Sequence, residues 1–433
     1  MGKLVVVLDF LVNSNDNSAF LCIFAHGMQL PKEMKRILVL STLLLLMTAP
    51  HLWAQKKELS QARSYIKSGN DYDKAEKLMT DLLANPANRT NKKIYTTWYE
   101  AISGQYAQAN EKLYLKQAYD TAAFFNITKR MYTVAETLDS LDMQPDSKGR
   151  VKPEYRKDHA EQLNLLRPNL YYGGTYQVRR ENYRTAFEYF DLYIGAAHQP
   201  LFTGYKYLES DKLITQAAYW ATLCGFKLQD AKMTLKYSQL ALTDQDKSRY
   251  VLHYMCDAYR QLKNEKEYLN TLNLGFKLFP SYSYFFPRLA DYYKDKGENE
   301  TVLKLSDQGL RKHPNNALFL LAKSIALLNM NRYDECITVS KQMIANNKDQ
   351  AEPYFSIATC YLNQALTLEQ YNEPRKYRQQ LLKLYTEACP YMEKYRKLAP
   401  LDTQRWGPAL YRIYLNLNKG KQFEEIDRMM RKN

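Results

Sequence analysis

Apolar residues recur along this chain with the spacing of amphipathic helices, and from about residue 249 the pattern repeats every 34 residues. Segments that begin at Arg249, Ser283, Ala317 and Ala351 share one register. Their fourth, eighth and eleventh positions are, in that order, large, small and mostly aromatic. These residues are Leu252, Phe286, Leu320 and Tyr354, then Cys256, Ala290, Ser324 and Ala358, then Tyr259, Tyr293, Leu327 and Tyr361. Because a small residue lets two antiparallel helices approach closely, the pattern predicts a stack of antiparallel helix pairs.

A proline follows the second predicted helix of two segments, at Pro280 and Pro314, where it would end the helix. With the large, small and Tyr positions of the first helix, this pattern resembles the tetratricopeptide repeat (TPR). Single positions depart from the consensus, such as Lys323 where Leu is usual. The resemblance implies an all-α fold: an α-solenoid of antiparallel helix pairs wound into a right-handed superhelix, whose concave groove binds another protein.

The match to the repeat varies along the chain, which suggests a domain division. Residues 55–166 are expected to form a helical, TPR-like region, with long helices around Tyr95–Gln108, Glu111–Asn126 and Thr128–Leu141. Residues 167–433 are expected to form the TPR array proper. Two insertions break its register, near 199–210 and near 363–383. Insertions in solenoids often contact partners, and equally often they only lengthen a helix or a turn.

The beginning of the chain has the layout of a secretory signal peptide at residues 34–54. Lys35 and Arg36 form a positive region, a run of 13 apolar residues follows from Ile37 to Ala49, and Ala54 precedes a plausible cut at Gln55. Since a signal peptide belongs at the start of a protein, residues 1–33 are interpreted as an upstream mis-start extension. We therefore expect export to the periplasm or the cell envelope, with no stable membrane span after cleavage.

The resemblance also implies which residues line the groove, because certain positions of each first helix point into it. Carried over to this chain, the partner-binding groove is Tyr250, His253, Asp257, Arg260, Tyr284, Asp291, Lys294, Leu318, Leu321, Ile325, Leu328, Phe355, Thr359 and Leu362. Four of these, Leu318, Leu321, Ile325 and Leu328, are apolar at positions that would face solvent in an empty groove. Exposed apolar patches mark partner surfaces, so they are predicted to hold apolar anchors of a peptide or helix. The alternative is that the next turn, the second insertion or a self-contact covers them.

Composition and charge narrow the classes of partner. Gly and Pro are scarce, at 15 each, which argues against an all-β fold rich in tight turns. The net charge is +15, but Lys and Arg are scattered among Asp and Glu with no basic block, so no nucleic-acid partner is expected. Tyr is abundant, at 37, and its rings could act as stacking platforms. The alternative to a protein-binding scaffold is therefore a module that binds a cell-envelope glycan or polysaccharide.

Motifs for catalysis are missing from the sequence. It contains no H-E-x-x-H, G-x-S-x-G, P-loop or G-x-G-x-x-G, so we expect no enzyme, cofactor or metal. The acidic group Asp139, Asp142 and Asp146 is a weak cation candidate, because its spacing fails the EF-hand pattern. The cysteines form no C-x-x-C pair, and a disulfide between Cys360 and Cys389 is left open.

Overall fold

The computed structural model describes residues 55–371 and 373–432, and the side chains of residues 374 and 432 are not described. The predicted upstream extension 1–33 and the predicted signal peptide 34–54 lie outside the described residues. Every regular element in the described part is a helix. The described chain divides into two compact units, the first up to Tyr176 together with Asp191–Ser210, and the second Gln177–Phe190 together with the residues from Asp211 onward.

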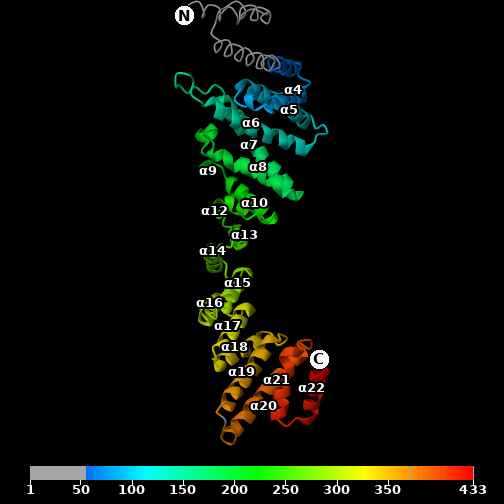
Figure 1. Ribbon diagram of the computed structural model, residues 1–433, viewed down its shortest axis with the longest axis vertical. Coiled ribbons are helices and arrows are strands. Elements are labelled where there is room, and N and C mark those ends of the chain that lie inside the picture. Colours follow the sequence, from blue (N-terminus) through cyan, green and yellow to red (C-terminus); the bar gives the residue numbers. More distant parts are fainter. Residues whose placement is uncertain (1–54, 372, 433) are drawn as a thin grey trace, which may run out of the picture. The chain divides into compact units, whose positions relative to one another are not determined.

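The first unit is built from long helices that follow one another along the chain (Figure 1). They are a helix over residues 55–68, α4 (Tyr72–Leu83), the short η1 (Pro86–Asn88), α5 (Lys92–Tyr114), α6 (Thr121–Asp142) and most of α7 (Arg156–Arg179). At its beginning, small residues alternate with large ones in a core that contains Ala62, Ala75, Met79, Ile94 and Ala101. The small residues let these helices approach closely.

Two helices occupy the region where three were predicted. A helix over Glu111–Asn126 is wrong, because the chain leaves the helical path between α5 and α6. Lys116 has a positive φ of 54°, and Asp120 caps α6 by accepting hydrogen bonds from the amides of Ala122 and Ala123 at 2.8 and 3.1 Å. A side-chain acceptor at this position satisfies amides that have no partner within the helix, and so fixes the start of α6.

The first insertion packs onto the first unit through three buried side chains. It forms η3 (Pro200–Tyr205) and α9 (Tyr207–Ser210), directly after η2 (Ala196–His198). Leu201, Phe202 and Tyr207 are buried, and the ring of Phe202 stacks on Tyr132 with centroids 5.6 Å apart. Arg167 lies between the rings of Tyr193 and Tyr207, with its Cζ 3.7 and 3.8 Å from their centroids. This segment is therefore a packing element.

The second unit is a run of mostly shorter helices, in which each helix from α10 onward packs against the next (Figure 1). Their bounds are α8 (Tyr183–Gly195, to Phe190 within this unit), α10 (Ile214–Lys227), α11 (Ala231–Lys236), α12 (Ser238–Ala241), α13 (Ser248–Gln261), α14 (Glu265–Leu278), α15 (Phe285–Asp295), α16 (Asn299–Lys312), α17 (Ala317–Asn329), α18 (Tyr333–Asn346), α19 (Glu352–Glu369), α20 (Pro374–Leu398), α21 (Thr403–Asn416) and α22 (Gly420–Lys432).

The helix pairs keep the register that the sequence predicts. The first helices α13, α15, α17 and α19 begin within two residues of Arg249, Ser283, Ala317 and Ala351. The large fourth-position residues and three of the four small eighth-position residues are buried, and Ala290 is half-buried. The all-α solenoid of antiparallel helix pairs is therefore confirmed. The described buried hydrophobic residues lie between Ala62 and Ile426.

Consecutive pairs of the second unit meet where a glycine faces an aromatic ring. A Cβ on Gly275 would lie 2.4 Å from the ring of Phe285, and one on Gly309 would lie 2.7 Å from the ring of Phe319. Each glycine is on the second helix of one pair, and each ring is on the first helix of the next. These two joints repeat at the 34-residue spacing, and the absence of a side chain at the glycine makes room for the ring.

The second insertion lengthens one helix pair. Residues 363–383 fall at the end of α19 and the beginning of α20, which have 18 and 25 residues. The core beside them contains Tyr385, Met392, Trp406, Leu410 and Ile426 from α20, α21 and α22. The insertion therefore lengthens the hairpin of α19 and α20, while the rest of α20 packs into a core with α21 and α22.

Candidate partner-binding face

Four of the predicted groove residues meet in a polar cluster on α13 and at the start of α15. The hydroxyl of Tyr284 donates to Oδ1 of Asp257 at 2.8 Å, and Arg260 donates to the same oxygen at 2.9 Å. The Nε2 atom of His253 lies 3.4 Å from Oδ2 of Asp257. Because His253, Asp257 and Arg260 are three and four residues apart, the helix itself places them on one face. We call these four residues, with Tyr282 and Arg288, the polar cluster.

Asp257 is the charged centre of the polar cluster. Burial by itself would raise the pKa of its carboxyl, but hydrogen bonds from His253 and Tyr284 and the charge of Arg260 hold the pKa below its usual value. The carboxylate is therefore ionised at neutral pH and fixed by its neighbours. Burial and the hydrogen bond to Asp257 raise the pKa of Tyr284, so its hydroxyl remains a donor. The arrangement holds these side chains in fixed positions on one face of α13.

Two members of the polar cluster were not among the predicted groove residues. Arg288 places its Cζ 3.6 Å from the centroid of the Tyr284 ring and donates to the carbonyl of Tyr284 at 3.0 Å. The hydroxyl of Tyr282 lies 3.2 Å from Nδ1 of His253. A spacing of four residues between Tyr284 and Arg288 is a sequence signal that could have identified the first. Tyr282 lies in the turn before α15, outside the positions carried over from the repeat.

The rest of the predicted residues on these helices are more exposed. Tyr250 is half-buried and its ring meets Tyr282 edge-on, with centroids 6.1 Å apart. Asp291 and Lys294 form an exposed ion pair at 2.9 Å, with side chains 69% and 46% accessible. Tyr284, in contrast, is buried, so it acts mainly through Asp257. A pair as exposed as Asp291 and Lys294 contributes little to stability, which leaves both groups accessible to a partner.

The four apolar residues predicted on the third repeat form a row along α17, which we call the apolar row. Leu318 is 45% exposed, and Leu321, Ile325 and Leu328 are half-buried. Leu321 and Leu328 also touch the core between α16, α18 and α19. Asn316 caps this helix by accepting from the amides of Leu318 and Phe319 at 3.0 and 3.3 Å. The cap fixes the start of α17 and so presents Leu318 at the surface.

The predicted residues of α19 lie among covering side chains. The guanidinium of Arg405 lies 3.7 Å from the ring centroid of Phe355 and binds both carboxylate oxygens of Glu352 at 2.9 Å. Thr359 is half-buried and Leu362 is buried. Phe355 therefore has a cation over its ring, which the sequence spacing did not reveal.

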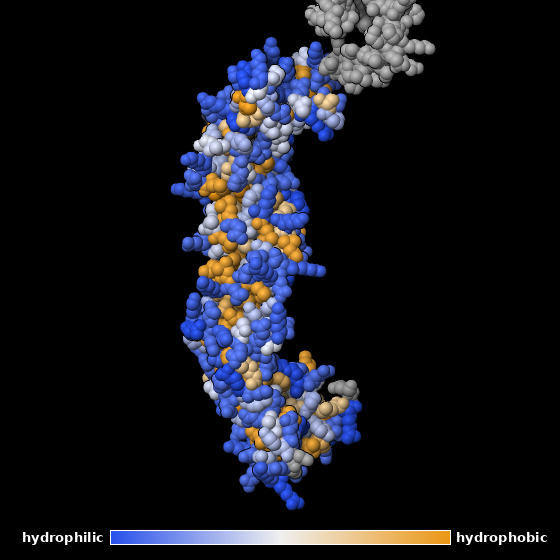
Figure 2. Space-filling model, turned by 60° about the vertical axis from the view of Figure 1, so that its left-hand side comes forward, coloured by the Kyte–Doolittle hydropathy of each residue, from blue (hydrophilic) through white to orange (hydrophobic). Residues whose placement is uncertain are grey.

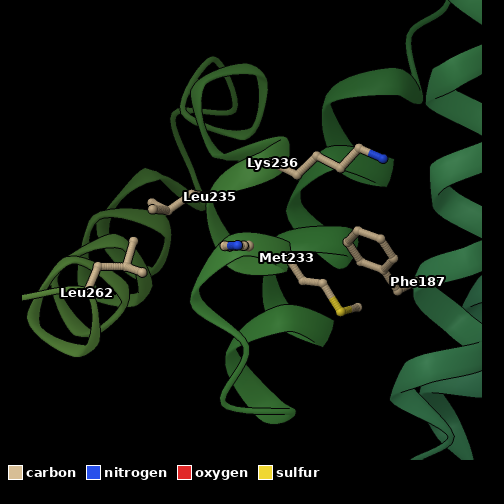
Figure 3. Close-up of a pocket in the computed structure, with 6 residues that line it drawn as sticks. Phe187, Met233, Leu235, Lys236 and Leu262 are labelled. Carbon is tan, nitrogen blue, oxygen red and sulfur yellow. The ribbon is translucent and has the colours of Figure 1, made fainter.

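An open apolar depression lies elsewhere in the second unit. It is lined by Phe187, Lys232, Met233, Leu235, Lys236 and Leu262. Figure 3 shows the side chains of Leu262, Leu235, Met233 and Phe187 spread across it, with Lys236 alongside. On the face shown in Figure 2, apolar surface lies between hydrophilic side chains along the middle helices. The lining of the depression contains no carboxylate, histidine or hydroxyl that could carry out acid–base chemistry.

The acidic group considered as a cation site is held by other partners. Asp139 accepts two hydrogen bonds from Arg156 at 2.7 Å, and Asp146 binds Arg150. Asp142 accepts from the amides of Glu154 and Tyr155 and pairs with Lys92 at 3.1 Å. The described residues contain no group of three or more His, Cys, Asp or Glu side chains arranged to hold a metal ion.

The five described cysteines are free thiols, so Cys360 and Cys389 are not joined by a disulfide. Cys336 and Cys360 share a core cluster, whereas Cys389 contacts Glu393 and Lys419 at 3.4 and 3.2 Å. In the described part of the chain, no helix combines the length and the hydropathy that a bilayer span requires.

Comparisons with known proteins find likeness at the level of structure only. No protein-family model matches the chain, and no curated protein matches its sequence. The TPR domain of P58(IPK) aligns over 84% of this chain and 98% of its own, at 13% identity and a TM-score of 0.27. Yeast Tom70 covers 86% and 90%, at 12% identity and a TM-score of 0.31. The TPR2AB domain of yeast Sti1, solved as a complex with pHSP90, covers 69% and 97%, at 15% identity and a TM-score of 0.23. TM-scores this low support no inference about the partner of this chain.

Proposed function

We propose that this chain is an exported, non-catalytic TPR scaffold that binds a segment of another protein on the face formed by α13, α15 and α17. The observation that carries the proposal is the apolar row beside helices that bear fixed charges. Leu318 is 45% exposed at the start of the row, and Leu321, Ile325 and Leu328 are half-buried behind it. Apolar side chains at the surface of a repeat array are typical of a partner site.

The charged residues supply the directional part of such a site. In the polar cluster, Asp257 already has hydrogen bonds from Tyr284 and Arg260, so its position is set before a partner arrives. The exposed pair of Asp291 and Lys294 can exchange its mutual contact for contacts with a partner. Fixed polar groups around an apolar centre are the usual arrangement of a protein interface, with the apolar centre supplying most of the affinity.

The test is a pair of charge-introducing variants that differ in the helix they alter. The chain from Gln55 is used for affinity purification from the cell envelope, and the recovered protein is identified by mass spectrometry and titrated against each variant. We expect Leu321→Glu with Ile325→Glu to weaken its binding at least about 30-fold, the effect of losing an interface hot spot.

The matched control places the same two charges on a second helix. Leu274 and Leu278 of α14 are 43% and 53% exposed, so Leu274→Glu with Leu278→Glu adds equal charge to a different face. The control should bind as the wild type does. Binding that survives the α17 changes, or that falls equally in both variants, contradicts the assignment of the site to α17.

Export to the periplasm is a further part of this proposal, supported by the signal-peptide layout of residues 34–54. N-terminal sequencing of the protein recovered from the periplasmic fraction should begin at or near Gln55. Recovery only from the cytoplasm, or a sequence that still begins at Met34 or earlier, contradicts it.

A glycan-binding module is the second candidate, and a different observation favours it. The centroid of the Tyr282 ring lies 6.1 Å from that of Tyr250 and 6.2 Å from that of His253. Half-buried aromatic rings beside charged hydrogen-bonding groups are suitable platforms for sugars. Binding of purified envelope polysaccharide that is lost in Tyr250→Ala with Tyr282→Ala, and kept in the α17 double variant, would favour this candidate over the scaffold.

A further inference from the structure

The hairpin formed by α19 and α20 is longer than the helix pairs on either side of it. These helices have 18 and 25 residues, against 13 and 14 in α17 and α18 and 14 and 13 in α21 and α22. Because a helix rises 1.5 Å per residue, the 11 or so extra residues of α20 extend it by roughly 16 Å. The added residues lie at the connection between the two helices, so this end of the hairpin projects beyond its neighbours.

The base of the hairpin is held firmly to the next helix pair. The hydroxyl of Tyr385 donates to Glu369 at 2.6 Å, and Nε of Arg412 donates to the Tyr385 hydroxyl at 2.9 Å. Arg412 also pairs with Glu369. This network occupies Glu369, Tyr385 and Arg412, and it ties the hairpin to α21. We call the described residues of this end, 366–371 and 373–383, the hairpin tip.

The hairpin tip carries apolar and aromatic side chains that its own core does not use. Leu366, Tyr371 and Leu382 are 38%, 61% and 51% exposed. The ring of Tyr371 lies beside that of Tyr377, with centroids 5.8 Å apart. Burying a helical extension usually requires apolar residues to face inward, and here three of them face solvent, which indicates a surface that meets something else.

The hairpin tip carries four cations and two carboxylates, so its net charge is positive. Arg375, Lys376, Arg378 and Lys383 are all exposed, and Glu373 already pairs with Lys376 at 2.8 Å. The ammonium of Lys376 lies 5.1 Å from the centroid of the Tyr377 ring. The second acidic residue, Glu369, is taken up by Arg412. The surface of the tip is therefore a group of cations around two tyrosine rings.

We infer that the hairpin tip docks on an anionic lipid surface. A projecting tip offers no groove for an extended peptide, but it can rest on a flat layer of headgroups. Tyrosine rings are favoured at the boundary between headgroups and acyl chains, and neighbouring Lys and Arg side chains are attracted by anionic headgroups. The exposed leucines add apolar contact at the same depth. The inference uses other residues than the proposed partner site and stands independently of it.

The experiment measures binding of the chain from Gln55 to vesicles by co-sedimentation. Vesicles of phosphatidylcholine with about 30% phosphatidylglycerol are compared with phosphatidylcholine alone, and we expect binding only to the anionic vesicles, lost at high salt. Arg375→Glu with Lys376→Glu and Arg378→Glu should weaken binding at least about tenfold, since each cation near the surface adds to the attraction. Tyr371→Ala with Tyr377→Ala should weaken it about fivefold while leaving its salt dependence unchanged.

The control variant changes the net charge by the same amount away from the tip. Lys266, Lys304 and Lys341 are exposed on α14, α16 and α18. Their joint replacement by Glu should leave vesicle binding within about twofold of the wild type if the tip is the site. Circular dichroism and a melting curve confirm that each variant is folded.

Three outcomes overturn the inference. The first is an absence of binding to anionic vesicles, and the second is an equal loss of binding in both charge triples. The third is tip-dependent binding to an acidic polypeptide such as polyglutamate without vesicle binding, which would assign the tip to a protein partner.

Discussion

The first unit ties long helices together with ion pairs that reach into half-buried positions, whereas the regular helix pairs of the second unit meet where a glycine faces an aromatic ring. In the first unit, Arg156 binds a carboxylate that is only 9% exposed, and Arg130 pairs with Glu76, which is 13% exposed. In the regular pairs of the second unit, Gly309 faces the ring of Phe319.

This difference explains why a repeat can be recognised in the sequence of the second unit and not in that of the first. A joint made of a small residue and a ring can be copied from pair to pair, because each pair meets the next in the same way. An ion pair across a loop joins two particular helices, so it produces no periodic pattern in the sequence. Substitutions at the two kinds of contact should therefore differ in how much they lower the free energy of unfolding and in how that loss depends on pH.

Removing a half-buried cation of the first unit should have the largest effect. Arg156→Met leaves the carboxylate of Asp139 buried without its two hydrogen bonds at 2.7 Å. Breaking a buried pair on one side costs about 3 kcal/mol or more, because the remaining charge is not compensated. Hydrogen exchange of the amides in α6 and α7 should report this loss as faster exchange in that region.

The control for this prediction is an ion pair of the same geometry at the surface. Arg332 binds both oxygens of Glu335 at 2.7 and 2.8 Å, but the two side chains are 37% and 56% exposed. Arg332→Met should cost at most about 1 kcal/mol, the usual range for surface pairs. Equal losses of unfolding free energy in Arg156→Met and Arg332→Met would show that burial does not make the ion pairs of the first unit stronger than surface pairs.

A methyl group at a joint of the second unit should have the next largest effect. In Gly309→Ala the new Cβ lies 2.7 Å from the ring of Phe319, which is buried and meets Phe286 at 4.6 Å. Overpacking of this kind costs about 1–3 kcal/mol, which exceeds the gain in helix propensity of about 1 kcal/mol. Urea unfolding followed by circular dichroism should show a lower midpoint.

Gly407 is the matched control, since it also lies within a helix but its Cβ would meet nothing within 4 Å. Gly407→Ala should be neutral or stabilising by up to about 1 kcal/mol. A double variant, Gly309→Ala with Phe319→Leu, should be less destabilised than the sum of its parts, because a smaller side chain relieves the contact. Additive costs would mean that the ring is not what opposes the methyl group.

The sequence predicted the second unit well because its packing repeats. The large fourth and small eighth positions are also the buried ones, since both properties serve the same helix contact. The same spacing links Gly275 to Gly309 and Phe285 to Phe319, yet a period does not tell which residues touch across a joint. In the candidate site, spacing put His253 and Asp257 on one face. It could not show that the Tyr284 ring would be buried while its hydroxyl binds the carboxylate.

In the first unit the sequence predicted helices but not what joins them. Asp139, Asp142 and Asp146 stood out as an acidic group, and proximity in the sequence suggested a shared ligand. In the structure each has its own partners, and Arg156, the partner of Asp139, lies 17 residues further along the chain. Such a contact depends on where α7 begins, which local patterns do not fix.

Acid should weaken the first unit through Asp142, with a smaller effect than the two changes above. Burial by itself would raise the pKa of Asp142, but hydrogen bonds from the amides of Tyr155 and Glu154 and the Lys92 ammonium lower it below its usual value. Its stabilising contribution is therefore present above the unfolded pKa near 4 and lost as the pH falls through the lower, folded pKa.

Asp142→Asn tests this sign directly. The variant should be less stable than the wild type at pH 7, and the difference should shrink as the pH falls below about 4, where the wild-type carboxyl takes up its proton. Hydrogen exchange in α6 at both pH values, corrected for intrinsic rates, measures the difference. A deficit that stays constant with pH would mean that the charge of Asp142 contributes nothing.

The smallest effect is expected where the second unit itself departs from its repeat. Lys323 occupies a position that is usually Leu, and its ammonium lies 2.6 Å from Oδ1 of Asp307, with side chains 25% and 42% exposed. A pair this accessible contributes about 0–1 kcal/mol, and Leu would add apolar contact to the same helix face. Lys323→Leu should therefore change the free energy of unfolding by less than about 0.5 kcal/mol. A double-mutant cycle with Asp307→Asn isolates the ion pair itself, and a coupling well above 1 kcal/mol would mean that the second unit, too, depends on charge to join its helices.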